Sequence, residues 1–169
     1  MAARRGIGTR TGTTTARTSL PRTIARLVLG AFLLFAGTAH LTVARSEFAA
    51  QVPSWLPLDA DVVVVASGVV ELLLGAALVA LGRYRVVVGW VVAAFFVAIF
   101  PGNVAQYVEG VSAFGLDTDA ARLTRLFFQP VLVLWALWST GAWRDRAVLS
   151  RTGRDRTGRN RTGRNRPRP

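Results

Sequence analysis

Four long stretches of apolar and small residues, separated by shorter polar connections, occupy the middle of the chain. The pattern predicts helices at about 23–43, 62–81, 86–103 and 122–142. A helix of about 20 apolar residues, rising ~1.5 Å per residue, spans the ~30 Å hydrocarbon core of a bilayer. The sequence therefore predicts an all-α fold, a bundle of four transmembrane helices that forms one domain over residues 23–143.

Prolines are expected to shape the third and fourth helices. The third is predicted to end at Pro101-Gly102-Asn103, with a loop over 104–121, and Pro130 is predicted to interrupt the fourth. Proline has no amide hydrogen, so it leaves the carbonyl four residues earlier without its usual donor.

The connection between the first two helices, at 44–61, mixes apolar side chains with charges and two prolines. Trp55 lies between those prolines, and a tryptophan at a membrane boundary is typical of an interfacial anchor. We therefore expect this segment on the membrane surface, anchored by Trp55.

One acid, Glu71, lies in the middle of the second apolar stretch. A charged group at the helix centre costs about 2.5–3.5 kcal/mol on insertion scales, so it normally faces protein or water rather than lipid. Gly68 lies three residues before Glu71, Gly75 four after it and Gly82 another seven on, a spacing that suits one helix face, and small residues let a neighbouring helix approach closely. The first helix has a similar glycine spacing. We expect Glu71 to point into the bundle.

Four further polar residues, His40, Asn103, Arg125 and Gln129, are placed by the predicted topology on the same side of the bundle. Together with Glu71 they are candidates to line a polar pocket open to the extracytoplasmic side, with Glu71 at its floor. Each also has a purely structural interpretation. The amides and His40 form interhelical hydrogen bonds, Arg125 extends toward head groups, and Glu71 holds helices in register.

The residue types argue against metal chemistry. His40 is the only histidine, only carboxylates and amides accompany it, and the chain has no cysteine. The lack of cysteine also excludes disulfides and dithiol redox motifs. No metal and no intrinsic cofactor are therefore predicted, and any redox role would depend on a bound cofactor or a partner.

Charge predicts the orientation of the chain. The net charge is +12, and the basic residues, all arginine, lie mostly in the tails at 1–22 and 144–169, which are predicted to be disordered. Together with Arg83 and Arg85 in a short hairpin, they predict a multi-pass protein of the cell membrane with both termini in the cytoplasm. A cleaved targeting peptide is the competing interpretation of the first tail.

The carboxyl-terminal tail repeats a five-residue unit, RTGRD or RTGRN, without apolar positions. Such a basic segment is attracted to anionic lipid head groups. Nucleic acid is not the expected partner, because no aromatic side chain is interleaved to stack on bases.

Four segments together resemble the DoxX-like family of small four-helix membrane proteins: GTAHLTVARSEFAAQVPSWLP, SGVVELLLGAALVALGRYR, FPGNVAQYVEG and RLTRLFFQPVLVLWALW. The resemblance covers about residues 24–143, and Phe127 departs from it by standing where relatives commonly have proline. The family takes its name from membrane subunits associated with a thiosulfate:quinone oxidoreductase. The resemblance therefore implies an accessory or quinone-docking subunit with a soluble oxidoreductase partner, and His40, Glu71, Arg125 and Gln129 as parts of the quinone site.

Three functions stay open at this point. The first is a membrane subunit of a redox or oxidative-stress system, as the resemblance implies. The second is a structural or assembly protein whose polar residues only pack helices. The third is a small transporter or proton pathway, which would need several copies because four helices make a thin wall. Whether the chain catalyses a reaction of its own is also open.

Overall fold

The structure is a computed structural model and describes residues 19–143. Its elements are α1 (Leu20–Leu41), α2 (Arg45–Ala49), α3 (Ala60–Ala80), the 3-10 turn η1 (Gly82–Tyr84), α4 (Arg85–Val108) and α5 (Asp119–Thr140). The described part of the chain contains no strand, and α1, α3, α5 and the η1–α4 unit are long and apolar enough to cross a membrane. The predicted all-α, four-helix fold is therefore confirmed. The predicted disordered tails fall, up to residue 18 and from residue 144, outside the described residues.

Short polar residues and one glycine set the helix ends. The Asp59 carboxylate accepts hydrogen bonds from the first amides of α3, and the Thr118 hydroxyl accepts one from the Ala121 amide at the start of α5. Gly141 adopts a left-handed conformation, with φ of 75°, and ends α5. α1 begins with Pro21 in its first turn, where the missing amide hydrogen has no cost. Residues 20–22, expected in the amino-terminal tail, are therefore helical.

The prediction that the third helix ends at 101–103 is wrong. α4 passes through Pro101 and ends at Val108, so the loop covers only 109–118. Proline is tolerated inside membrane helices where neighbouring groups satisfy the freed backbone. Here the Gln129 side chain donates to the carbonyl of Phe96, next to the Val97 carbonyl that Pro101 deprives of its donor.

The fourth predicted helix is also more regular than expected. α5 continues through Pro130 without interruption, and it begins at Asp119, three residues before the predicted start. Thr118 explains the earlier start, because its capping hydroxyl fixes the first turn.

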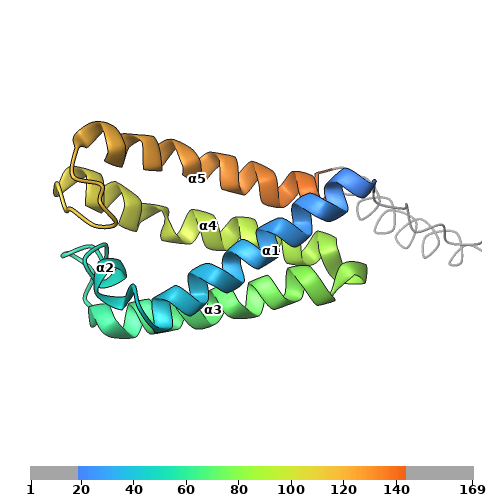
Figure 1. Cartoon of the computed structure of the whole chain (residues 1–169), viewed down its shortest axis with the longest axis horizontal. Helices are drawn as coiled ribbons and strands as arrows, with labels where there is room; N and C mark the ends of the chain where they lie inside the picture. Colours follow the sequence, from blue (N-terminus) through green and yellow to red (C-terminus); the bar gives the residue numbers. More distant parts are fainter. Residues whose placement is uncertain (1–18, 144–169) are drawn as a thin grey trace, which may run out of the picture.

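The long helices form two pairs, α1 with α3 and α4 with α5 (Figure 1). α1 crosses the bundle obliquely, so its first turns lie against α5 and its last turns against α3. The pairs diverge toward the end where α2 and the 109–118 loop lie, here called the α2 end. The opposite end has Arg22, Arg83 and Arg85 and is called the basic end.

Glycines bring α1 and α3 into backbone contact. A Cβ atom on Gly37 would lie 2.7 Å from the Gly68 carbonyl oxygen, and one on Gly75 would lie 2.8 Å from the Gly30 carbonyl oxygen. Only glycine fits at such distances, as the sequence predicts for a close helix pair. Gly82 is the exception. It follows α3, and a Cβ there would meet only the end of the Arg26 side chain, at 3.7 Å.

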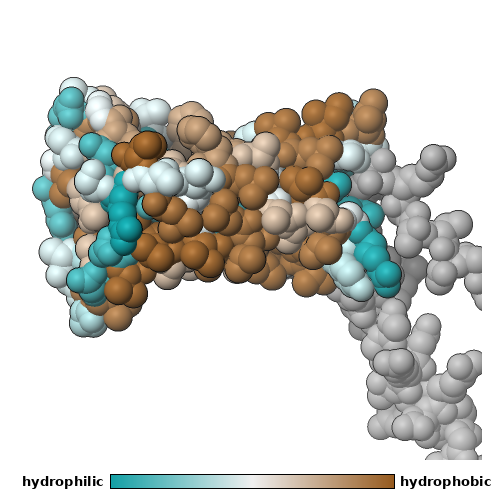
Figure 2. All heavy atoms as spheres, turned by 60° about the horizontal axis from the view of Figure 1, so that its bottom comes forward, coloured by the Kyte–Doolittle hydropathy of each residue, from teal (hydrophilic) through white to brown (hydrophobic). Residues whose placement is uncertain are grey.

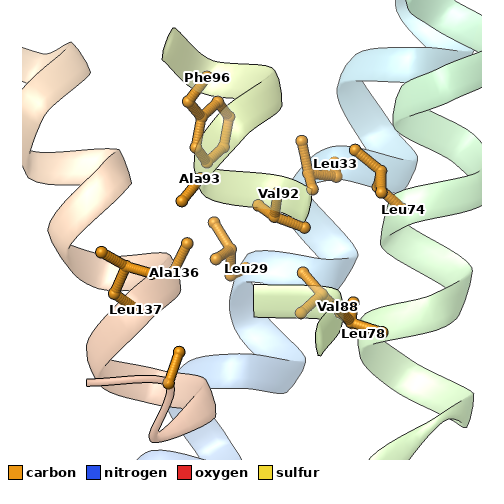
Figure 3. Packing of buried hydrophobic residues seen from close by; sticks show 11 residues of the cluster. Leu29, Leu33, Leu74, Leu78, Val88, Val92, Ala93, Phe96, Ala136 and Leu137 are labelled. Carbon is orange, nitrogen blue, oxygen red and sulfur yellow. The ribbon is translucent and has the colours of Figure 1, made fainter. Parts of the chain in front are cut away.

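The apolar core fills the half of the bundle nearest the basic end. Figure 3 shows side chains from all four long helices meeting around Leu29, which is 0% exposed. The core consists mainly of Leu29, Leu33, Leu74, Leu78, Val88, Val92, Ala93, Phe96, Ala136 and Leu137.

On the face seen in Figure 2, a broad apolar belt lies between two more polar ends of the bundle. Many large apolar side chains are exposed along all four long helices. A soluble monomer rarely exposes so large a contiguous apolar surface, whereas a membrane-spanning bundle presents one to lipid.

Candidate functional site

The structure brings His40 and Glu71 together, as the last turn of α1 lies against the middle of α3. His40 Nδ1 is 2.9 Å from Glu71 Oε2, and both side chains are buried. Glu71 is 5% exposed, so the expectation that it points into the bundle is confirmed. The glycine contact between Gly37 and Gly68 places the two helices close enough for this pair to form.

Glu71 Oε2 nevertheless lacks a directed hydrogen-bond donor. His40 Nδ1 is also 2.9 Å from the carbonyl oxygen of Ala36. An N–H on the imidazole lies in the plane of the ring, and from Nδ1 this direction makes a hydrogen bond with the Ala36 carbonyl but not with Glu71 Oε2. Among the described residues no other donor is directed at Oε2. A buried carboxylate oxygen in this position is costly unless a proton or a ligand satisfies it.

Two aromatic rings cover the His40–Glu71 pair. The Phe48 ring, from α2, stacks on the His40 imidazole with 3.3 Å between centroids. Phe114, from the 109–118 loop, packs edge-on against Phe48 at 4.6 Å. Phe114 has a φ of 54°, a conformation uncommon for non-glycine residues, and its amide donates to Glu47 Oε2 at 2.7 Å. Strained backbone of this kind occurs often at ligand sites.

Arg125 extends the same contact series toward α5. Its guanidinium donates to Gln51 Oε1 at 2.7 Å and lies 5.6 Å from the centre of the Phe114 ring. The Gln51 amide thus uses its oxygen to bind Arg125. Its nitrogen, Nε2, is buried and has no hydrogen-bond partner in the described structure. An unpaired acceptor on Glu71 and an unpaired donor on Gln51 thus occur in one linked group of side chains.

Asn103 and Gln129 form a second, separate pair. Asn103 Nδ2 donates to Gln129 Oε1 at 2.9 Å, and both residues are buried between α4 and α5. Gln129 also donates to the backbone of α4, so its amide uses both its oxygen and its nitrogen. These contacts fit the interhelical hydrogen-bonding role that was one of the two interpretations of these residues.

The five residues expected around one pocket are therefore divided. His40 contacts Glu71, Asn103 contacts Gln129, and Arg125 contacts neither pair. No hydrogen bond joins the two pairs within residues 19–143. The division follows from the divergence of the two helix pairs at the α2 end, which the sequence did not reveal.

The sequence interpretation missed the contribution of the 44–61 connection and the 109–118 loop. Phe48, Gln51 and Phe114 lie directly against the candidate residues, and Pro53 is buried, so the 44–61 segment is more than a surface connection. The apolar residues of 44–61 were a usable signal, because a purely superficial segment does not need them. Trp55 is 64% exposed, a position compatible with the predicted anchor.

Ion pairs hold this end together. Arg45 donates two hydrogen bonds to the Asp61 carboxylate, which fastens α2 to the first turn of α3 and raises the pKa of the Arg45 guanidinium. Arg122 is buried, lies 3.5 Å from Asp119 and donates to the carbonyls of Leu116 and Asp117. These contacts hold the 109–118 loop against α5. In the described range no three His, Asp or Glu side chains converge to hold a metal ion.

Comparison with known protein families matches residues 29–140 to the Domain of unknown function (DUF8561). The match extends from the first half of α1 to the last residue of α5. It therefore includes all five candidate residues and both aromatic rings that cover them. No curated protein and no solved structure matches the chain. Since the match covers more than half of the 169 residues, the chain belongs to the DUF8561 family.

Proposed function

We propose that this protein is a multi-pass subunit of the cell membrane that docks a quinone or quinol head group at the α2 end and exchanges a proton with it. In this role it is an accessory subunit of a redox or oxidative-stress system, working with a soluble oxidoreductase. The resemblance to the DoxX-like family suggested this function, and the proposal depends on the chemistry of the site rather than on the resemblance.

The observation that carries the proposal is the unsatisfied Oε2 of Glu71, buried beside His40. A carboxylate there accepts a hydrogen bond from a quinol hydroxyl, and the protonated acid donates to a quinone carbonyl. His40 is the polar group beside this acid, with Nδ1 at 2.9 Å from Oε2. Acid–base groups act on a ligand when they are within hydrogen-bond reach of the proton that moves.

Gln51 supplies the complementary group. Its free Nε2 donor suits a carbonyl oxygen, and Arg125 fixes the orientation of the amide through Gln51 Oε1. A quinone has a carbonyl or a hydroxyl at each end of its ring, so the proposal requires one ring to reach both the Glu71 acceptor and the Gln51 donor. Phe48 and Phe114 give this region the apolar surroundings that a planar head group needs. A bound quinone would supply two-electron, two-proton chemistry, and the chain would bind the ring and transfer a proton at Glu71.

Orientation is part of the same proposal. The basic end has several arginines, and no acid of the described residues lies there. The α2 end has Glu47, Asp59, Glu109 and other acids. By the positive-inside rule the basic end faces the cytoplasm, so both termini are cytoplasmic and the α2 end is extracytoplasmic. Because the chain has no cysteine, single cysteines at Arg83 and Ser112 test this cleanly. An impermeant thiol reagent added to intact cells should label the Ser112→Cys variant only.

The test of docking compares two carboxylates on α3. Wild type, Glu71→Gln and Asp61→Asn are purified in detergent from membranes with the same quinone content. The quinone that stays bound to each protein is then extracted and quantified. Asp61 is a matched control, because it lies on the same helix and undergoes the same chemical change but is exposed and paired with Arg45. We expect Glu71→Gln to lose at least about tenfold in affinity, typical of removing a charge-assisted hydrogen bond, and Asp61→Asn to retain quinone.

A second variant separates docking from folding. Gln51 lies outside the long helices, and Gln51→Met removes its free donor. This variant should also weaken quinone binding, while the helix content measured by circular dichroism and the elution volume of the purified protein stay unchanged. Equal quinone retention in wild type and Glu71→Gln would refute the proposal. Copurification of a soluble oxidoreductase with the wild-type chain tests the partner separately.

A structural or assembly role is the second candidate, and the Asn103–Gln129 pair favours it. Both amides are used in contacts between α4 and α5, as expected of side chains that only fix helix packing. In that case Glu71→Gln changes stability alone, and no quinone is enriched over the bulk lipid extract. The two candidates therefore give opposite results in the same experiment.

A further inference from the structure

An apolar groove opens on the side of the bundle between α1 and α5. It has a volume of about 490 Å³ and is lined by Ala25, Val131, Leu134, Trp135 and Trp138. The α5 residues recur at helical spacing, so they form one stripe that extends about 10 Å along the helix at ~1.5 Å per residue. The Trp135 indole N–H donates to the Ala25 carbonyl at 3.0 Å, which leaves its ring as an apolar wall.

Arg22 stands at the end of this groove. Its guanidinium lies 5.8 Å from the centre of the Trp138 ring, and Arg22 precedes Ala25 by three residues on the same face of α1. Trp138 belongs to the last turns of α5, so the groove begins at the basic end and continues into the apolar belt. A positively charged side chain therefore lies beside one end of an open apolar groove.

The electrostatic setting of Arg22 favours an anion. Arg22, Arg26, Arg83 and Arg85 all belong to the basic end, and every described acid belongs to the α2 half or the middle of the bundle. Arg26 is occupied by its hydrogen bond to the Leu78 carbonyl at the end of α3. For Arg22 the described contact is the Trp138 ring, which leaves its N–H donors available to an oxygen anion.

We propose that this groove binds an anionic phospholipid, with one acyl chain along Val131, Leu134 and the two tryptophans and its phosphate on Arg22. The groove is open on its outer side, as suits an acyl chain that also contacts the surrounding lipid. Basic pockets between membrane helices are suited to anionic head groups, and arginine binds phosphate oxygens in a bidentate way. The groove begins at the basic end, whereas the proposed quinone site lies toward the α2 end, so the two proposals are independent.

Native mass spectrometry of the full chain in detergent tests the proposal. Phosphatidylglycerol and phosphatidylcholine with identical acyl chains are added separately, and the lipid-bound fraction is measured. We expect retention of one phosphatidylglycerol and much less phosphatidylcholine. Arg22→Gln should reduce phosphatidylglycerol binding about fivefold, as expected for one arginine near a head group, whereas Arg22→Lys should keep most of it. The control is Arg83→Gln, which removes the same charge at the same end beside Tyr84, away from the groove.

The apolar part has its own matched pair. Ala25→Leu fills the groove and should lower phosphatidylglycerol binding, whereas Ala31→Leu adds the same bulk to an exposed position of α1 and should not. Equal losses in Arg22→Gln and Arg83→Gln would overturn the proposal, because they indicate a general surface attraction. Equal retention of both lipids would also overturn it. A dimer abolished by Ala25→Leu, without a lipid effect, would assign the groove to a second copy instead.

Discussion

The two halves of this bundle differ in what their buried side chains do. Near the basic end, Leu29 and its apolar neighbours fill the interior, and buried polar groups such as Arg26 and Thr140 donate to backbone carbonyls. Near the α2 end, polar side chains meet one another, and Glu71 and Gln51 each have a buried atom without a hydrogen-bond partner in the described structure. The first arrangement stabilises the fold, and the second leaves groups available for chemistry.

The residues that stabilise the fold and the residues proposed to bind a ligand are therefore different sets. Binding sites often retain unsatisfied or strained groups at a cost to stability, and the rest of the fold offsets that cost. In this protein the offset comes from the packed half and from the glycine contact of α1 with α3. Substitution of a packed residue should therefore lower the free energy of unfolding, whereas substitution of Glu71 or Gln51 should leave it unchanged or raise it.

The largest effect is expected from Leu29→Ala. Removing a large side chain that is 0% exposed leaves a cavity, and such changes cost about 2–5 kcal/mol of unfolding free energy. Leu27→Ala is the matched control, because Leu27 lies on the same helix and is 39% exposed. Steric trapping in bicelles measures both variants. Similar losses in the two would contradict the placement of the core.

Gly37→Ala tests the contact on which the His40–Glu71 pair depends. A Cβ at this position meets the backbone of α3, which cannot move aside like a side chain, so we expect a loss of about 1–3 kcal/mol. Gly82→Ala is the control, since its Cβ has room, and it should be nearly neutral. If Gly37→Ala is also neutral, the two helices are further apart than described. The same steric-trap measurement applies.

A smaller effect is expected at the second polar pair. Gln129→Leu leaves the Asn103 amide and the Phe96 carbonyl without their partner, and interhelical hydrogen bonds of this kind are worth about 0.6 kcal/mol, at most about 1.7. A double-mutant cycle with Asn103→Leu measures the coupling directly. A coupling of zero would show that the amides do not interact in the folded protein.

The smallest change, and the one of opposite sign, is expected for Glu71→Gln. The substitution removes a buried carboxylate oxygen without a directed donor, so the unfolding free energy should rise, by up to about 1 kcal/mol. Gln51→Met should also be neutral or stabilising, because it removes the unpaired Nε2. A clear loss of stability in Glu71→Gln would indicate that the carboxylate holds the helices together, as the structural interpretation requires.

Much of the architecture could be predicted from the sequence, because lipid imposes simple rules. A helix satisfies its own backbone in a bilayer, so length and hydropathy located the four spans, and a single acid in an apolar stretch indicated its buried face. Errors arose at Pro101 and Pro130. Whether proline ends a helix depends on donors from neighbouring helices, such as the Gln129 amide beside α4, and these are not visible along the chain.

The sequence by itself determined the number of long helices, the inward direction of Glu71 and the glycine spacing of α1 and α3, because each depends on local periodicity and on burial. Only the tertiary structure decided that His40 is the partner of Glu71, that Asn103 and Gln129 form another pair, and that Phe48 and Phe114 cover the acid. Those pairings depend on how the oblique α1 and the two diverging helix pairs cross, and crossing is set by the packing of all four helices at once.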